Sequence, residues 1–279
     1  MLVRDPRKVR DTAIPAALRL TDPAALLARE PDVVVDVLSD ASTGLALTRA
    51  ALGRGVDVVS ANKQAIGGDL AALTALAATG GATLLYAASV GGGAPLIETV
   101  RRARAHGEIV RIEAVLNGTC NFILNRLAEG VAFDAAVAAA QAAGFAEADP
   151  SADLSGLDAA AKLAILAFEA NGRRLRVEAV TRQTLSAASA LLSAPVRQVA
   201  RLTLGRAEAS VRFEGTDGDP LFARLADENN AIRVTTADGC LFTAGGRGAG
   251  RIPTVESVWA DLTDVLSEID IAPQGKGGR

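Results

Sequence analysis

The β-branched run Asp32–Leu38 (DVVVDVL) restricts the fold of this chain more than any other segment. A run of this kind is typical of a strand buried inside a parallel sheet. Helical and strand patterns then alternate along the chain, over residues 45–52, 56–59, 70–78, 83–86 and 95–106. Strands that alternate with helices in units of this length predict a parallel sheet with crossover helices.

The pattern changes after Glu108. Residues 109–116 alternate between apolar and polar, as in an antiparallel strand with one polar face. Helices are predicted over 121–128, 133–143, 157–167 and 186–192, and strands over 179–180, 199–204, 209–213, 232–235 and 240–243. Residues 245–250 are interpreted as a glycine-rich loop before a last helix that ends near Ser267. The second half therefore predicts an α+β domain with a mostly antiparallel sheet.

Composition excludes several classes of protein. The formal net charge of −3 gives no indication of a nucleic-acid partner. No apolar run reaches the roughly 20 residues of a membrane span, and the charged start lacks a signal-peptide core. Cys120 and Cys240 have no metal-ligand spacing and are expected to be reduced thiols in a cytoplasmic protein. His106 is the only histidine, so histidine triads and multi-histidine metal sites are not expected, and a helix-end cap is predicted for it.

The stretch Ala140–Lys162 carries the candidate chemistry. Asp158 and Lys162 are four residues apart and share one helix face, with the acid on the favourable N-terminal side. The residues from Leu163 to Phe168 are apolar nearly all round, which predicts a buried helix. A lysine there needs a carboxylate partner or a lowered pKa, and it could exchange a proton with a carbonyl or alcohol oxygen. The alternative is a solvated ion pair.

Polar segments follow three predicted strands, at the carboxyl edge where parallel sheets bind ligands. They are Leu38–Asp40, Ser60–Lys63 and Ser89–Ala94. The run Gly91–Gly93 in the third segment lacks the G-x-G-x-x-G spacing. Consecutive glycines can expose carbonyls to a cation as readily as amides to an anion. Ordinary polar loops are the alternative interpretation.

The pattern A-x3-G-F-A-x2-D-P-x2-D-L-x-G-x-D-x3-K, from Ala140 to Lys162, resembles the signature of the homoserine dehydrogenase family at every fixed position. Members interconvert L-homoserine and L-aspartate 4-semialdehyde with NAD(P)(H), in the biosynthesis of threonine and methionine. The resemblance runs from Leu2 to about Ile271. It implies an α/β fold with an incomplete Rossmann-type parallel-sheet nucleotide domain over 1–108 and an α+β catalytic and dimerisation domain over 109–250. It also implies a C-terminal helix, 251–271, that packs back on the nucleotide domain.

The resemblance assigns roles to particular residues. Lys162 would exchange a proton with the substrate oxygen, Asp158 would position it, and Lys63 would lie near substrate and cofactor. The implied substrate-binding residues are Glu147, Asp153, Gly118 and Thr119. The implied cofactor-binding residues are Arg4, Lys8, Ser39, Ser60, Asn62, Lys63 and Gly248. A monovalent cation, Na⁺ or K⁺, would bind backbone carbonyls of Ala87, Val90, Gly92 and Ala94. The cations Arg4 and Lys8 favour NADP(H) over NAD(H), whereas Asp5 could favour NAD.

An ordinary dinucleotide-binding domain begins with a strand and a G-x-G-x-x-G loop, and this sequence contains neither at its start. The resemblance makes Leu2–Arg4 the second strand of that domain, so we expect an exposed sheet edge there. Three alternatives stay open. The first is that the strand and loop are encoded before Met1. The second is a non-catalytic paralogue that keeps the substrate pocket, and the third is an enzyme for a related amino-acid semialdehyde. A small-molecule substrate and a homodimer that shares a sheet are also implied.

Overall fold

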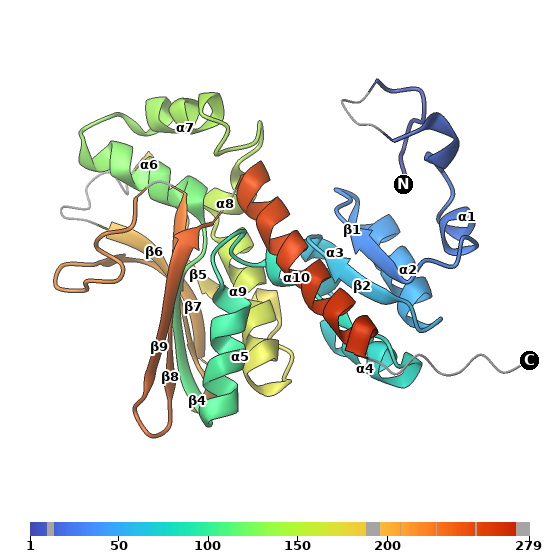
Figure 1. Ribbon diagram of the computed structural model, residues 1–279. Coiled ribbons are helices and arrows are strands. Elements are labelled where there is room, and N and C mark those ends of the chain that lie inside the picture. Colours follow the sequence, from blue (N-terminus) through green and yellow to red (C-terminus); the bar gives the residue numbers. More distant parts are fainter. Residues whose placement is uncertain (10–13, 188–195, 207, 227, 249, 272–279) are drawn as a thin grey trace, which may run out of the picture.

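The computed structural model describes residues 1–9, 14–187, 196–206, 208–226, 228–248 and 250–271. Figure 1 shows two separate sheets, a small one from the N-terminal part and a large one from the second half, with helices between them. The small sheet is parallel and the large sheet is mostly antiparallel. The predicted fold class is confirmed. Among the described helices, none combines the length and the apolar character that a transmembrane segment requires.

The small sheet has the strand order β1-β2-β3. Its strands are β1 (Val33–Asp36), β2 (Asp57–Ser60) and β3 (Leu84–Leu85). The short helices η1 (Ala16–Leu18) and α1 (Pro23–Leu27) precede it, and α2 (Ala41–Leu52), α3 (Lys63–Gly67) and α4 (Leu70–Gly80) connect its strands. Asp40 caps α2 by accepting from the Thr43 amide at 2.8 Å. The crossover helices are buried against the sheet through Leu47, Leu52, Ile66 and Leu73.

The edge of β1 that points away from β2 borders a cavity. The predicted strand Leu2–Arg4 is reduced to a single parallel bridge between Leu2 and Leu20. A cavity of about 260 Å³ lies between this bridge and β1, and its lining, mostly apolar, includes Met1, Leu2, Val33, Val35, Val37 and Leu47. Val35 is 40% exposed and Val37 is 65% exposed. Among the described strands β1 pairs only with β2, so its other edge has no backbone partner in the sheet.

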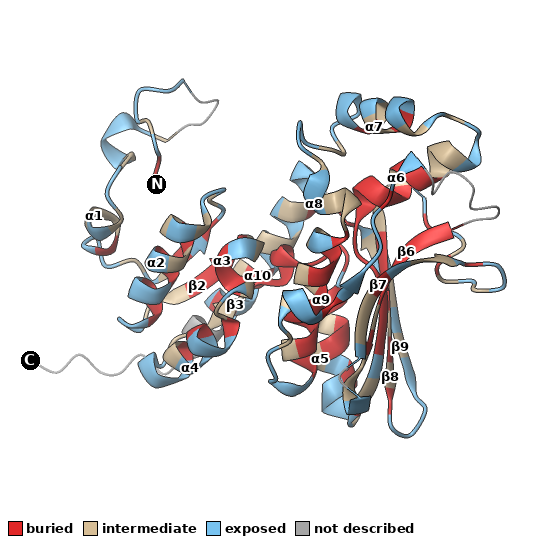
Figure 2. Ribbon diagram, turned by 180° about the vertical axis from the view of Figure 1, so that it is seen from behind, coloured by how far each residue is buried: buried red, intermediate tan, exposed pale blue. Residues whose placement is uncertain are grey.

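The large sheet has the order β5-β7-β6-β4-β8-β9. Its strands are β4 (Ile109–Val115), β5 (Thr181–Arg182), β6 (Val196–Thr203), β7 (Glu208–Gly215), β8 (Asn229–Thr236) and β9 (Leu241–Arg247). One face is apolar and packs on α5 (Leu96–His106) and α9 (Leu157–Asn171). Figure 2 shows this buried layer between the sheet and the two helices. α6 (Gly118–Ala128), α7 (Phe133–Ala142) and α8 (Ser151–Leu154) cover one end of the sheet.

The opposite face of the large sheet carries a network of ion pairs, because side chains alternate between the two faces of a strand. Glu113 of β4 is buried, and it pairs with Arg201 of β6 and, at 3.7 Å, with Arg233 of β8. Arg201 also contacts Glu214 at 2.6 Å, and Arg233 contacts Asp219 at 2.7 Å. Each of the two arginines in this network therefore contacts two carboxylates.

Two local predictions are wrong. Gly245–Arg247 is the end of β9, paired with β8, and not a loop. Glycine lets β9 approach this loop closely, since a Cβ atom on Gly246 would lie in a tight contact, 3.2 Å from the Ala94 Cα. The strand predicted at residues 179–180 is displaced, since a 3₁₀ turn η3 (Val177–Ala179) precedes β5. The helix predicted over 186–192 lies mostly outside the described residues.

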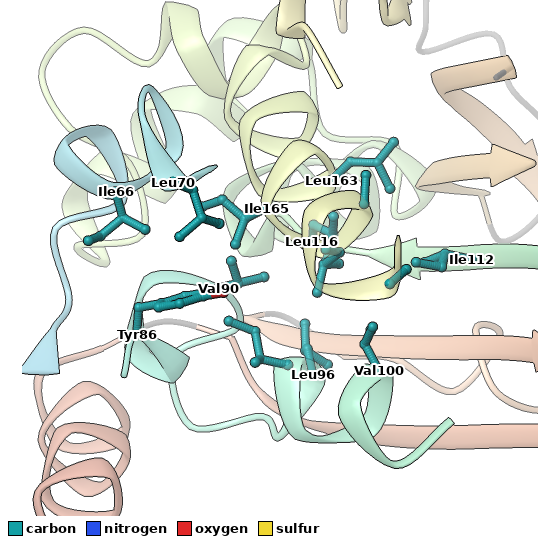
Figure 3. Close-up of a cluster of buried hydrophobic side chains, with 14 of the residues drawn as sticks. Ile66, Leu70, Tyr86, Val90, Leu96, Val100, Ile112, Leu116, Leu163 and Ile165 are labelled. Atoms are coloured by element: carbon teal, nitrogen blue, oxygen red, sulfur yellow. The ribbon is translucent and has the colours of Figure 1, made fainter. Parts of the chain in front are cut away.

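The two sheets are joined by buried contacts. Figure 3 shows apolar side chains that point toward one another between the elements, among them Val90, Leu96, Val100, Leu163 and Ile165. Glu169 of α9 accepts hydrogen bonds from the Tyr86 hydroxyl and, at 3.1 Å, from Arg101 of α5. Burial, together with the charge of Glu169, raises the pKa of Tyr86, so the tyrosine stays a donor.

The helix α10 (Arg251–Ile271) packs against β2 and the 3₁₀ turn η2 (Ala87–Ser89). Asp261 on this helix is 4% exposed, and its Oδ2 accepts from the Ala87 amide at 2.8 Å. Burial raises the pKa of Asp261 from 3.8 to about 6, although this hydrogen bond lowers it. Such a group stabilises the fold below its unfolded pKa, and the stabilisation is lost as the pH rises through its folded pKa.

We therefore expect Asp261→Asn to raise the free energy of unfolding at pH 7.5, by on the order of 2 kcal/mol. The amide oxygen can still accept from Ala87, while the cost of a buried charge disappears. Urea denaturation between pH 4 and pH 8 measures the effect, and the variant should lose the fall in stability seen in this range. Glu256→Gln, at an exposed position of the same helix, is the control. Equal stability of wild type and Asp261→Asn at pH 7.5 would contradict the assignment.

Candidate active site

Lys63, Asp158 and Lys162 meet between the two sheets. Asp158 lies in the first turn of α9, which begins after Gly156 with φ 72°. Its Oδ2 is 2.8 Å from Lys162 Nζ, and its Oδ1 pairs with Lys63 Nζ. The side chains of Asp158 and Lys162 are 11% and 14% exposed. The predicted i,i+4 pair and the poor solvation of Lys162 are both confirmed.

The shared carboxylate stays ionised. Burial by itself would raise the pKa of Asp158, but the charges of Lys162 and Lys63 outweigh it and hold this pKa well below its usual range. Asp158 is therefore a fixed anion that orients two ammonium groups and is not itself a proton donor. Lysine is scarce in this chain, with four lysines among 29 lysine and arginine residues. Two of the four meet here, and lysine, unlike arginine, can exchange its proton.

Lys162 keeps one donor for a ligand. Its ammonium group donates to the Leu116 carbonyl at 2.7 Å, at the end of β4, and contacts Asp158. An ammonium group has three N–H donors. Within the part of the chain that the structure describes, these two contacts use two of them, so the third is available to an oxygen atom of a bound molecule.

Asn117 forms hydrogen bonds with two carboxylates of the site, those of Asp153 and Asp158. Its amide nitrogen donates to Asp153 Oδ1 at 2.6 Å and to Asp158 Oδ2 at 2.9 Å, while its oxygen caps α6 by accepting from the Cys120 amide. Burial raises the pKa of Asp153, despite the hydrogen bond from Asn117. Sequence reasoning missed Asn117 and the Leu116 carbonyl. The available signal was an amide residue between a strand and the Gly118-Thr119 turn.

The other predicted substrate residues lie around this centre. Gly118 is pressed against the backbone of Glu228, 2.8 Å from where its own Cβ would lie. Thr119 donates from Oγ1 to the Phe145 carbonyl at 2.6 Å. That bond holds the segment that carries Glu147, whose side chain is exposed. The structure thus brings Asp153, Gly118 and Thr119 to the site and leaves Glu147 at its margin.

Three of the predicted cofactor residues line one cavity. Arg4, Lys8 and Ser39 surround a space of about 650 Å³ between the N-terminal segment and the loop after β1. Asp5 and Asp40 line the same space, so it contains charges of both signs. The cationic side chains and its position at the carboxyl end of β1 fit a dinucleotide's phosphate groups.

Ser60 and Asn62 instead hold the strand ends together. Both are buried, and Ser60 Oγ lies 3.4 Å from Asp36 Oδ2. Asn62 caps α3 by accepting from the Ala65 amide at 3.2 Å, and it donates to the Asp40 carbonyl at 3.3 Å. Lys63 is the first residue of α3, so the Asn62 cap also fixes the backbone position of Lys63.

Gly248 packs against Asn230, and Asn230 lies beside the site. A Cβ atom on Gly248 would lie 2.2 Å from Asn230 Cγ, so only glycine fits. Asn230 Nδ2 lies 3.5 Å from the Leu116 carbonyl, the oxygen that also accepts from Lys162. Gly248 is thus close to the site through packing, with its own amide bonded to the Glu228 carbonyl at 2.8 Å.

The proposed cation ligands lie on one loop. Ala87, Val90, Gly92 and Ala94 are buried on η2 and the turn that follows it. The Ala87 and Ala94 carbonyls accept backbone hydrogen bonds from Val90 and Leu96. A carbonyl has a second lone pair, and neutral carbonyls are donors that suit a monovalent cation. The donor type therefore fits Na⁺ or K⁺.

Comparison with known proteins identifies the family. The sequence model described as homoserine dehydrogenase matches residues 95–263, and that of the homoserine dehydrogenase NAD binding domain matches residues 2–87. The chain is 33% identical to a homoserine dehydrogenase of Synechocystis sp., over 96% of this chain and 65% of the relative. It is 35% identical to an NAD(+)-dependent homoserine dehydrogenase of Pseudomonas canavaninivorans, over 81% and 66%.

A solved structure is also similar. It is a hyperthermophilic archaeal homoserine dehydrogenase in complex with NADPH, with a TM-score of 0.80 and 29% identity over 88% of this chain and 75% of that one. The chain spans slightly less than two thirds of the length of the two curated relatives. The family match covers the residues that build the site at Asp158 as well as both sheets. The chain belongs to the homoserine dehydrogenase family.

Proposed function

We propose that this protein interconverts L-homoserine and L-aspartate 4-semialdehyde with NAD(P)(H). The observation that carries the proposal is the free donor position on Lys162, whose ammonium group is held by Asp158 and the Leu116 carbonyl. A lysine fixed in this way can give a proton to a carbonyl oxygen, or accept one from a hydroxyl group. Family membership supports the same chemistry.

Each residue of the site has a part in this reaction. Lys162 gives its proton to the aldehyde oxygen in the reductive direction and accepts it in the oxidative one. Lys63, on the other oxygen of Asp158, places a second positive charge where an aldehyde oxygen or a carboxylate can bind. Asp153 and Glu147 would hold the amino end of the substrate, and Gly118 and Thr119 shape the pocket. The nicotinamide cofactor, when bound, supplies or accepts the hydride.

We further propose that NADP(H) is preferred, with Arg4 and Lys8 facing its 2′-phosphate. Both line the cavity at the end of β1, but Asp5 lies beside them. We expect Arg4→Ala to lower kcat/KM with NADP⁺ by roughly tenfold, since a charge-assisted hydrogen bond is worth about 1.5 kcal/mol, and to leave kcat/KM with NAD⁺ unchanged. Steady-state kinetics with both cofactors decide. Arg7→Ala, on the same segment and paired with Asp5, is the control, and equal losses with both cofactors would count against a 2′-phosphate contact.

The function is tested by titrating the 279-residue chain with NADPH, followed by fluorescence, and then by an assay with L-homoserine and NADP⁺. Micromolar binding with turnover supports the proposal. If cofactor does not bind, the gene upstream of Met1 is examined for an in-frame strand and G-x-G-x-x-G loop. Activity restored by that segment also supports it. No binding and no such segment would favour a non-catalytic paralogue instead.

Assembly and ion binding are proposals too. We infer a homodimer that shares a sheet through the exposed strands of the second half, and light scattering that shows a monomer at micromolar concentration would count against it. We also infer that Na⁺ or K⁺ binds the loop 87–94. The melting temperature should then be higher in either NaCl or KCl than in choline chloride at equal ionic strength. A cytoplasmic location and a role in threonine and methionine biosynthesis complete the proposal.

A further inference from the structure

A second group of chemically active side chains lies far from Lys162. His106 is the last residue of α5, and Asp238 and Cys240 lie in the turn between β8 and β9. One ligand atom from each of the three lies within 4.8 Å of the others. Figure 1 shows this turn at the lower end of the molecule, beside the lower end of α5. The three residues are exposed, and His106 is separated from the other two by more than 130 positions.

The group is held in place by its neighbours. His106 Nε2 is 2.9 Å from Asp238 Oδ2. The other oxygen of Asp238 accepts from Thr236 Oγ1 at 2.6 Å and from the Cys240 amide at 3.2 Å. The His106 ring packs against Phe242 with centroids 5.3 Å apart. The bonds that Asp238 accepts are of the kind that orients a ligating carboxylate in known metal sites, and the contact between His106 and Asp238 brings two ligand atoms together.

We propose that His106, Asp238 and Cys240 form a three-ligand site for a borderline divalent transition-metal ion such as Zn²⁺. Imidazole nitrogen, thiolate sulfur and carboxylate oxygen are the three donor types that Zn²⁺ takes, whereas Mg²⁺ and Ca²⁺ are bound by oxygen alone. Water completes the tetrahedron. The position of His106 at the C-terminal end of α5 adds the negative end of the helix dipole. The bound ion ties α5 to the β8–β9 turn.

A cysteine nucleophile is the less suitable interpretation. A nucleophilic cysteine acts as the thiolate. Here Asp238, not Cys240, is the hydrogen-bond partner of His106, so His106 is not placed as the base for the Cys240 thiol. A metal ion displaces the thiol proton and uses all three side chains together.

Cobalt spectroscopy tests the proposal on the whole reduced chain. Co²⁺ is expected to bind with one equivalent, with a thiolate-to-cobalt charge-transfer band that Zn²⁺ then removes. His106→Ala and Cys240→Ser should each weaken Zn²⁺ binding by at least about tenfold, because loss of even an indirect partner of a ligand costs 10- to 100-fold. Asp238→Asn should also weaken Zn²⁺ binding, and Asp217→Asn is its matched control, which should leave Zn²⁺ binding unchanged. Both aspartates precede a positive-φ glycine, Gly218 or Gly239, in an exposed turn.

Thiol reactivity gives a second readout that needs no activity. Cys240 is exposed and Cys120 is buried, so a thiol reagent should modify Cys240 first in the folded protein. Zn²⁺ should slow this reaction at least tenfold in the wild type and leave it unchanged in His106→Ala. Absence of the charge-transfer band in the wild type, or equal Zn²⁺ protection in His106→Ala, would overturn the proposal. Circular dichroism of each variant checks that the fold is kept.

Discussion

Replacing Lys162 with alanine is expected to lower kcat by roughly 100- to 10,000-fold, the contribution of a positioned general acid or base. The substituted side chain can no longer pass a proton to the substrate oxygen, while the carbonyl of Leu116 and the carboxylate of Asp158 keep other donors nearby. The loss should appear in kcat more than in KM, because proton transfer belongs to the transition state. Steady-state oxidation of L-homoserine measures it.

Two further variants separate chemistry from folding. Lys162→Met keeps most of the apolar stem in a helix that is otherwise buried, so it should fold like the wild type and be as inactive as the alanine variant. Arg54→Ala removes an exposed cation just after the end of α2 and should keep full activity. If Lys162→Met retained more than a tenth of the wild-type kcat, Lys162 would not be the group that exchanges the proton.

Asp158→Asn is expected to lower the free energy of unfolding by about 3 kcal/mol, the lower end of the range for breaking a buried pair. Two ammonium groups, 14% and 26% exposed, would lose their common counter-ion. The carboxylate pKa lies below its ordinary value, so Asp158 stabilises the fold above the unfolded pKa of 3.8, and this is lost as the pH falls below it. Urea denaturation at pH 7 and at pH 3 measures both effects.

The pH dependence distinguishes this ion pair from a general packing effect. The difference in stability between wild type and Asp158→Asn should shrink as the pH falls from 7 to 3, because the unfolded chain takes up a proton on this carboxyl below its pKa of 3.8 while the folded protein keeps it ionised. Asp217→Asn, in an exposed turn, should change stability by no more than about 0.5 kcal/mol. A difference that stays constant over this pH range would show that Asp158 does not act through its charge.

The sequence predicted the part of the site that is local in the chain. Asp158 and Lys162 share a helix face, and helical spacing alone places them together. Lys63 joins the same carboxylate from 95 positions away, and Asn117 from 41. The resemblance named Lys63, but no spacing rule could place it on Asp158, and Asn117 had no signal beyond its neighbours. His106 and Cys240 were judged separately for the same reason, since only the fold brings them together.

The sequence predicted those strands whose side chains are β-branched or alternate between apolar and polar. β1, β2 and β4 carry β-branched or alternating runs and were found at the expected places. Gly245 and Gly246 were assigned to a loop because glycine is rare in strands, yet in β9 glycine allows the backbone to lie close to Ala94. Leu2–Arg4 has strand-like residues, but a strand needs a neighbouring strand to pair with. Among the described residues this segment forms one bridge, between Leu2 and Leu20.

The unequal strand lengths of the two sheets have a consequence for local unfolding. β1 and β2 have four residues each and β3 has two, whereas β6, β7 and β8 have eight. Amide hydrogens of β1 should therefore exchange with solvent long before those of β4 and β6, which lie inside the large sheet. A nucleotide that binds beside β1 would have to order this weak region first. The measured affinity for the nucleotide would then be weaker than its affinity for molecules in which β1 is already ordered. The ratio of the two affinities equals the fraction of molecules in that ordered state.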